Sequence, residues 1–126
     1  MLPIVRADER RRTQTPNATM TTHASPTLGA TTGLSMWQVE MRAGARGPEH
    51  VFDTEQAWTI TQGQLTIELD GEQATLNPGD TIILPGGVTR QISADSDALA
   101  LVCGHGTGIA RVPGEPTPRG TPPWIA

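Results

Sequence analysis

The sequence contains no lysine and no tyrosine, a single cysteine, a single phenylalanine and no long hydrophobic run. Every cationic side chain is therefore an arginine, a bias typical of high-GC bacterial genomes. Because Cys103 has no second cysteine to pair with, an internal disulfide is excluded. No stretch approaches the roughly 20 apolar residues that a membrane helix needs, and residues 1–5 are too short for a signal peptide. We therefore expect a bacterial, cytoplasmic protein without a membrane partner.

Positive charge is also scarce, because 9 arginines face 13 acidic residues and give a net charge of −4. The one basic run, residues 10–12, directly follows Asp8 and Glu9. Nucleic-acid binding requires clustered cations that neutralise phosphates and release counterions. We therefore expect no nucleic-acid partner and interpret the basic run as part of a solvated arm.

Length and composition predict one small all-β domain. The chain has 126 residues, enough for one modest core, and its 14 Gly and 11 Pro against 17% charged residues indicate many turns. We expect an N-terminal arm over residues 1–16, a barrel domain over 17–106 and a proline-rich tail over 107–126. The tail ends on Trp124 and Ile125, which we expect to pack on the barrel or on a partner subunit.

Alternation with period two dominates the middle of the chain. Residues 65–69 alternate apolar and polar side chains, and Asp70-Gly71 is the dipeptide of a two-residue hairpin leading into residues 73–76. The same alternation predicts that Leu99, Leu101 and Cys103 share one face, with Cys103 packed rather than reactive. About eight or nine short strands with frequent turns indicate a sandwich or a closed antiparallel barrel.

Two spaced motifs resemble those of the cupin superfamily. Five framework positions match in order, and they are Gly44, Gly63, Gly79, Pro85 and Gly87. The resemblance covers roughly residues 34–103 and implies a jelly-roll-like antiparallel barrel, also called a double-stranded β-helix. Glycines at turns between strands allow positive φ or close backbone approach, so these residues build the barrel whatever its chemistry.

The resemblance also marks four positions that hold metal ligands in metal-binding cupins. The family's two histidines, glutamate and final histidine correspond to His50, Phe52, Gln56 and Arg90. Phenylalanine cannot ligate, glutamine is a poor neutral ligand, and arginine is a cation without an acceptor. We therefore expect no metal and no cofactor there. A zinc or iron site rebuilt from the remaining histidines is an alternative, but scattered histidines are usually surface or core residues. These histidines are His23, His50 and His105.

The replacements predict a small-molecule pocket. If His50, Gln56 and Arg90 point into the barrel, three polar groups converge on an apolar lining, as is typical of small-molecule sites. The predicted lining is Phe52, Trp58, Ile60, Val39 and Met41. An inward arginine requires a partner. One alternative is an internal network in which Gln56, backbone carbonyls, Glu49, Asp53 or Glu55 accept from Arg90. The other is a ligand anion held by the planar guanidinium.

We interpret the chain as a binder of a small oxygenated or anionic metabolite. The favoured function is a metal-independent isomerase, cyclase or lyase, with His50 moving a proton while Arg90 and Gln56 stabilise an oxyanion. Resemblance to small cupins implies a role in bacterial secondary metabolism and a homodimer formed through the terminal extensions. Two alternatives stay open: a non-catalytic binding or sensor protein, and a metal-dependent oxygenase or lyase with unconventional ligands.

Overall fold

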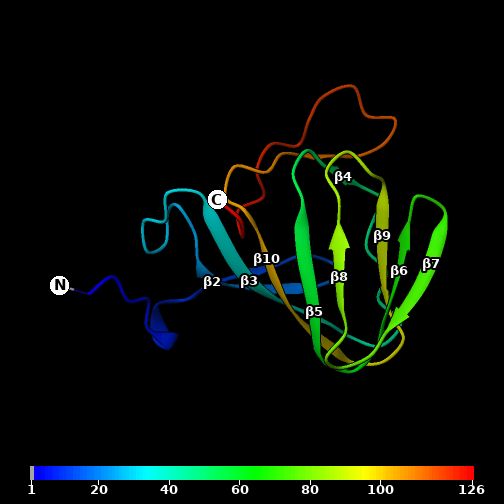
Figure 1. Cartoon of the computed structure of the whole chain (residues 1–126), viewed down its shortest axis with the longest axis horizontal. Coiled ribbons are helices and arrows are strands. Elements are labelled where there is room, and N and C mark those ends of the chain that lie inside the picture. Colours follow the sequence, from blue (N-terminus) through cyan, green and yellow to red (C-terminus); the bar gives the residue numbers. More distant parts are fainter. Residues whose placement is uncertain (1) are drawn as a thin grey trace.

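The computed structural model describes residues 2–126, so the first residue of the predicted arm, Met1, lies outside the described part. Within that part the only helix is a 3-10 turn, η1 (Ala7–Glu9), and the rest of the regular structure is strand (Figure 1). The strands are β1 (Arg11–Gln14), β2 (Thr19–Ala24), β3 (Leu34–Met41), β4 (Val51–Phe52), β5 (Gln56–Gln62), β6 (Leu65–Leu69), β7 (Glu72–Leu76), β8 (Thr81–Leu84), β9 (Arg90–Ala94), β10 (Ala98–His105) and β11 (Ala110–Arg111). No helix in residues 2–126 is long and apolar enough to cross a membrane.

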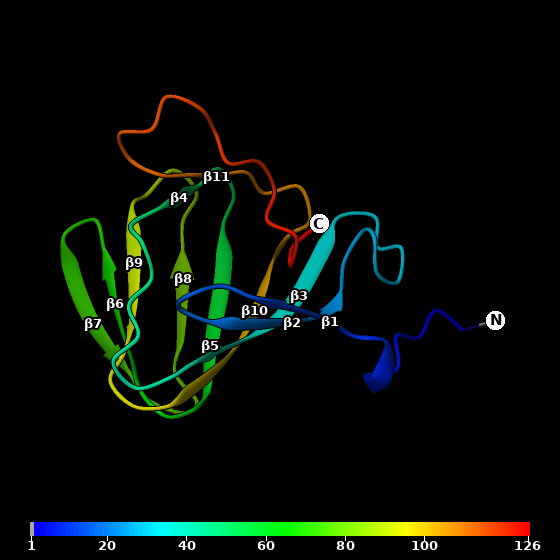
Figure 2. The ribbon, with the colours of Figure 1, turned by 180° about the vertical axis from the view of Figure 1, so that it is seen from behind.

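The strands form one large and two small antiparallel sheets that enclose a common core. The large sheet has the order β1-β2-β3-β10-β5-β8, and the small sheets have the orders β7-β6-β9 and β11-β4. Figures 1 and 2 show the small sheets facing the large sheet across the barrel. The all-β antiparallel barrel predicted from the sequence is therefore confirmed.

Alternation along β10 decides which side chains enter the core. Val102 pairs with Trp37 on β3 and with Trp58 on β5, so a small residue lies between two indoles. Ala98 and Ala100 precede Val102 on this inner face, and all three are buried. Leu99, Leu101 and Cys103 share one face, as predicted, and it is the outer face of the strand. The prediction that Cys103 is packed was wrong, because Cys103 is exposed. Register against the buried Trp37 and Trp58 therefore places the smaller side chains of β10 on the inner face.

The turns follow the glycines of the sequence. Asp70 (φ 50°) and Gly71 (φ 83°) both have positive φ, as the predicted two-residue hairpin requires. Gly63 has φ 73°, and a Cβ added there would collide with the carbonyl oxygen of Asp97. This glycine is therefore needed both for its backbone conformation and for the close approach of the next loop.

Both ends of the chain add to the barrel. Strand β1 lies inside the stretch predicted as an arm and pairs with β2, which extends the large sheet by one strand. At the other end, Ile125 is fully buried, and the Thr22 hydroxyl donates a hydrogen bond of 2.7 Å to the carbonyl oxygen of Trp124. The homodimer stays a prediction, but burial of the tail does not depend on it.

Candidate functional site

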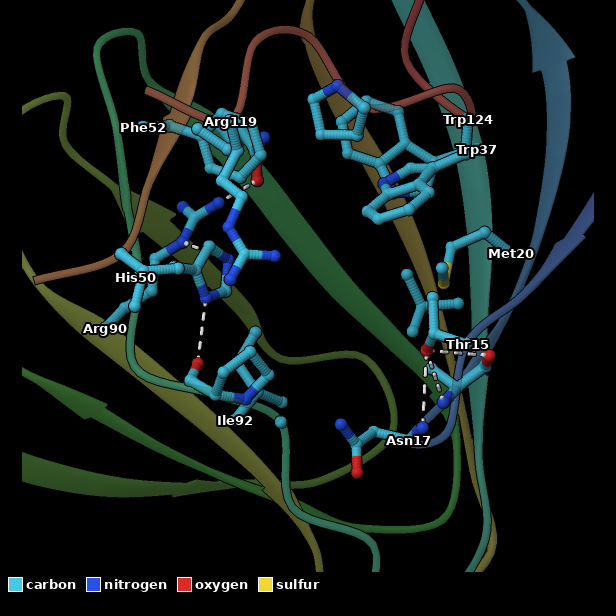
Figure 3. A pocket seen from close by; sticks show the side chains of 18 of the residues that line it. Thr15, Asn17, Met20, Trp37, His50, Phe52, Arg90, Ile92, Arg119 and Trp124 are labelled. Atoms are coloured by element: carbon cyan, nitrogen blue, oxygen red, sulfur yellow. Dashed lines mark hydrogen bonds between the residues drawn. The ribbon is translucent and has the colours of Figure 1, made fainter. Parts of the chain in front are cut away.

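A cavity of about 490 Å³ opens between the large sheet and the strands β4 and β9 (Figure 3). All three tryptophans of the chain line it, together with three of its nine arginines, and no aspartate or glutamate does. The lining residues are Thr15, Pro16, Asn17, Ala18, Met20, Trp37, Val39, Met41, Gly47, Pro48, His50, Phe52, Gln56, Trp58, Arg90, Ile92, Ala110, Arg111, Val112, Arg119, Thr121, Pro122, Pro123 and Trp124.

Most side chains that the sequence predicted for the pocket do line this cavity. His50, Gln56 and Arg90 converge there as expected, with Phe52, Trp58, Val39 and Met41 among the lining. Ile60 does not line it. That side chain follows Trp58 by two residues on β5, so it points to the same side of the sheet, but it is fully enclosed in the core.

Arg90 is the centre of the polar network, and it is only 1% exposed. One terminal nitrogen, Nη2, donates a 2.7 Å hydrogen bond to Gln56 Oε1, and Nε donates a longer one of 3.3 Å to His50 Nε2. The same Gln56 oxygen accepts a 3.1 Å bond from Trp58 Nε1. The guanidinium carbon lies 4.5 Å from the centre of the Phe52 ring, so a cation–π contact holds the plane of the group.

No carboxylate in residues 2–126 forms an ion pair with Arg90. The acidic partners considered from the sequence, Glu49, Asp53 and Glu55, are exposed, and Asp53 Oδ1 instead accepts the backbone N–H of Ile109. The other terminal nitrogen of Arg90, Nη1, is buried without a hydrogen-bond partner. Burial lowers the pKa of Arg90 to about 10, so the side chain is still cationic at neutral pH. The cavity therefore contains an unneutralised charge with one free donor.

His50 is neutral in this setting, and its two ring nitrogens have different roles. Nδ1 lies 2.9 Å from the carbonyl oxygen of Pro48, so it carries the proton and donates, which leaves Nε2 to accept from Arg90. Burial, and then the nearby charge of Arg90, lower the pKa of His50 to about 4, although the bond to Pro48 acts in the other direction. Backbone hydrogen bonds of 3.0 Å in both directions fix His50 directly opposite Arg90.

This lowered pKa predicts that His50 makes the protein less stable in mild acid. Between pH 6.5 and 4 the unfolded histidine binds a proton that the folded one does not, so stability falls as the pH falls through this range. The loss attributable to His50 is about 2–3 kcal/mol. Urea unfolding at pH 7 and pH 4.5 should show this loss of unfolding free energy in the native protein and not in His50→Asn. Equal pH slopes for the two proteins would contradict the lowered pKa.

The sequence did not reveal the residues at the mouth of the cavity. The turn between β1 and β2 contributes residues 15–18 on one side, and the tail contributes Arg119 and residues 121–124 on the other. Figure 3 shows Thr15, Asn17 and Trp124 on the side of the cavity opposite Arg90 and His50. The apolar end of the tail indicated that it docks somewhere, but no pattern in the sequence indicated where. Arg111 and Arg119 add positive charge at the mouth, although Arg119 is paired with Glu115.

The three histidines considered for a rebuilt metal site do not come together. Across residues 2–126 no group of three or more His, Cys, Asp or Glu side chains has a geometry that could hold a metal ion. His105 is exposed on the outer face of β10, and His23 lies on β2, away from the cavity lining. The alternative of a site built from these histidines was therefore wrong.

Comparison with known proteins agrees with the barrel and its framework glycines. The family model described as "Cupin domain" matches residues 37–103, which is more than half of the chain. The chain belongs to the cupin family. No sequence among curated proteins matches this cupin.

Solved cupin structures share the fold at low sequence identity. KdgF from Halomonas sp. is 24% identical with a TM-score of 0.69, over 81% of this chain and 91% of that chain. An RmlC-like cupin from Shewanella frigidimarina is 16% identical with a TM-score of 0.69, over 81% and 88%. Salicylate 1,2-dioxygenase from Pseudoaminobacter salicylatoxidans is 17% identical with a TM-score of 0.72, over 83% of this chain but 31% of that chain. At these identities the likeness supports the fold alone.

The residues at the four family ligand positions do not fit a metal ion in this cupin. His50 is the one good ligand, and its Nε2 already accepts from Arg90. Gln56 Oε1 is shared between Arg90 and Trp58, while Phe52 offers no donor atom. The buried guanidinium would also repel a divalent cation placed beside it. The donor set suits an anion rather than a cation.

Proposed function

We propose that this cupin binds a small organic anion in its barrel and converts it by metal-independent proton transfer. The observation that carries the proposal is the charge of the lining: three arginines and no acidic residue surround the cavity of a protein whose net charge is −4. A buried cation without a counter-charge is costly, and a ligand anion is the group that would offset that cost.

Arg90 is the proposed anchor for a carboxylate or enolate oxygen. Its Nη1 is buried and unpartnered, so it can donate to an incoming oxygen without giving up an existing bond. The Phe52 ring and the Gln56 oxygen hold the guanidinium in one plane before the ligand arrives. Such preorganised donors stabilise negative charge that develops on a reacting oxygen.

His50 is the proposed proton shuttle. A ligand anion held by Arg90 Nη1 would partly cancel the charge that lowers the His50 pKa. The imidazole would then gain the higher proton affinity that a general base needs, and it would take a proton on Nε2 by opening the long 3.3 Å bond from Arg90 Nε. Isomerisation, cyclisation and elimination next to a carbonyl all require this pair of roles, and small cupins of bacterial secondary metabolism offer a context for them.

A binding or sensor function is the second candidate, and one observation favours it. His50 Nε2 is engaged by Arg90 and the His50 pKa is about 4, so the imidazole is a weak base. A pocket that only recognises an anion needs Arg90 and the apolar lining but no proton transfer. The two candidates therefore share a ligand and differ in what His50 does.

One experiment separates these candidates. Small molecules released from the purified, denatured protein are identified by mass spectrometry and then supplied to native protein and to His50→Asn. An enzyme should convert its ligand, and His50→Asn should bind with similar affinity while losing about 100-fold or more in rate, as expected for loss of a general base. Binding by both proteins with no product from either would contradict catalysis and support the sensor.

Two expectations about the protein's context stay predictions. The homodimer is tested by the mass of the protein in solution, and the cytoplasmic location by fractionation of its host.

A further inference from the structure

We infer that the ligand is a hydrophobic monocarboxylate, with one anionic end at Arg90 and an apolar, unhydroxylated body. The inference rests on the proposed function, because it takes Arg90 as the anion anchor. It goes further by specifying the rest of the molecule, and by excluding sugar acids and sugar phosphates as the class of ligand.

The wall away from Arg90 is apolar. Met20, Trp37, Val39 and Met41 line it from β2 and β3, each no more than 5% exposed. Figure 3 shows Met20, Trp37 and Trp124 grouped on one side of the cavity, with Arg90, His50 and Phe52 on the other. A ligand spanning the cavity would therefore place its charged end and its remaining body in two very different environments.

The interior offers too few polar groups for a sugar. Three polar side chains lie inside the barrel, and two of them, His50 and Gln56, are already hydrogen-bonded to the third, Arg90. At the rim, the Thr15 hydroxyl is used within its own turn, where it accepts from two backbone N–H groups and lies 3.2 Å from the Ala18 carbonyl, so Asn17 and Thr121 are the uncharged polar side chains left there. A sugar hydroxyl that faces the apolar wall would lose its water without gaining a partner, and that loss is unfavourable.

The available donors also limit the charge of the ligand. Inside the barrel one cationic nitrogen, Arg90 Nη1, is buried and free. At the mouth, Arg111 is exposed, so its charge is screened by solvent. The Arg119 side chain is 61% exposed and makes two hydrogen bonds to Glu115, so its charge is both screened and largely neutralised. A single carboxylate matches one free donor, whereas a phosphate dianion would need further buried cations. The cavity volume of about 490 Å³ is ample for a bicyclic acid.

The test compares three probes by isothermal titration calorimetry: 2-naphthoate, its neutral analogue 2-naphthamide, and D-glucuronate, a hydroxylated monocarboxylate. We expect 2-naphthoate to bind about 10-fold or more tightly than 2-naphthamide, because a charge-assisted hydrogen bond is lost. We expect no detectable binding of D-glucuronate. Val39→Thr, which places a hydroxyl on the apolar wall, should weaken the binding of 2-naphthoate. The matched outer-face variant Leu101→Thr should leave that binding unchanged.

The outcomes distinguish this inference from the function on which it rests. If D-glucuronate binds at least as tightly as 2-naphthoate and both are lost in Arg90→Met, the ligand class is overturned and the anion site stands. If 2-naphthoate and 2-naphthamide bind equally in the native protein, the charge of the ligand is irrelevant and both ideas fail. Failure of both carboxylates to bind at millimolar concentration also overturns both. The comparison of ligands in native protein does not depend on any variant folding.

Discussion

Arg90→Met is expected to reduce the affinity for 2-naphthoate by about 100-fold, equivalent to ~3 kcal/mol, by removing the buried donor that receives the carboxylate. The protein should remain folded. Methionine is flexible, apolar and close in length to the arginine stem, and apolar replacement of a buried charge is often neutral or stabilising. Calorimetry measures the affinity, and urea unfolding shows whether the barrel is retained.

The matched control for this variant is Arg42→Met. Arg42 is an exposed arginine that does not line the cavity, so its loss changes the net charge equally without touching the site. The affinity of the Arg42→Met protein for 2-naphthoate should stay within about twofold of the native value, since exposed charges act weakly at a distance in salt. Equal affinities of Arg90→Met and native protein would show that the buried guanidinium does not hold the ligand.

The sequence predicted the barrel because its framework residues act locally. Positive φ at Gly63, Asp70 and Gly71 depends on the residue itself and its immediate neighbours. Convergence of His50, Gln56 and Arg90 was predicted from the resemblance to the cupin motifs, in which these positions face the barrel interior, and alternation along the strands agreed with it.

The sequence itself contains evidence against some of the acidic partners considered for Arg90. Glu49, Asp53 and Glu55 are each next in sequence to a side chain that enters the cavity, namely His50, Phe52 and Gln56. In extended chain, adjacent side chains point to opposite faces, which argues against Glu49 and Glu55 as partners of Arg90. Asp53 lies in the bend after β4, where alternation does not hold, so its direction required the structure.

Other features required long-range packing. Both faces of β10 carry small or apolar residues, so the hydrophobic pattern of residues 98–103 could not decide which face is buried. The decision comes from the register, which pairs Val102 with Trp37 and Trp58, two buried residues on the neighbouring strands. The position of Trp124 at the cavity mouth likewise depends on contacts between residues about 100 positions apart in the sequence. One of these is the hydrogen bond from the Thr22 hydroxyl to the carbonyl oxygen of Trp124.

Gln56→Leu is expected to destabilise the fold by about 4 kcal/mol, because the Gln56 side-chain oxygen accepts hydrogen bonds from two buried donors. Removing Oε1 leaves Arg90 Nη2 and Trp58 Nε1 without an acceptor in a cavity wall where Gln56 is only 3% exposed. Unpaired buried donors, one of them charged, cost more than the bonds themselves contribute. Urea unfolding at pH 7 measures the loss, and a change below about 1 kcal/mol would show that water or a shifted side chain replaces the oxygen.

Gln56→Glu is the informative partner of that variant, because it keeps the acceptor and changes only the charge. The carboxylate would pair with Arg90 and hold the network together, so stability should stay much closer to the native value than in Gln56→Leu. The charge of the site would be cancelled, so affinity for 2-naphthoate should fall by about 10-fold or more. The pKa of His50, followed by NMR, should rise, since the Arg90 charge that helps to lower it would be neutralised. A Gln56→Glu protein that binds 2-naphthoate as tightly as the native one would show that ligand capture depends on the apolar wall and not on the unneutralised charge of Arg90.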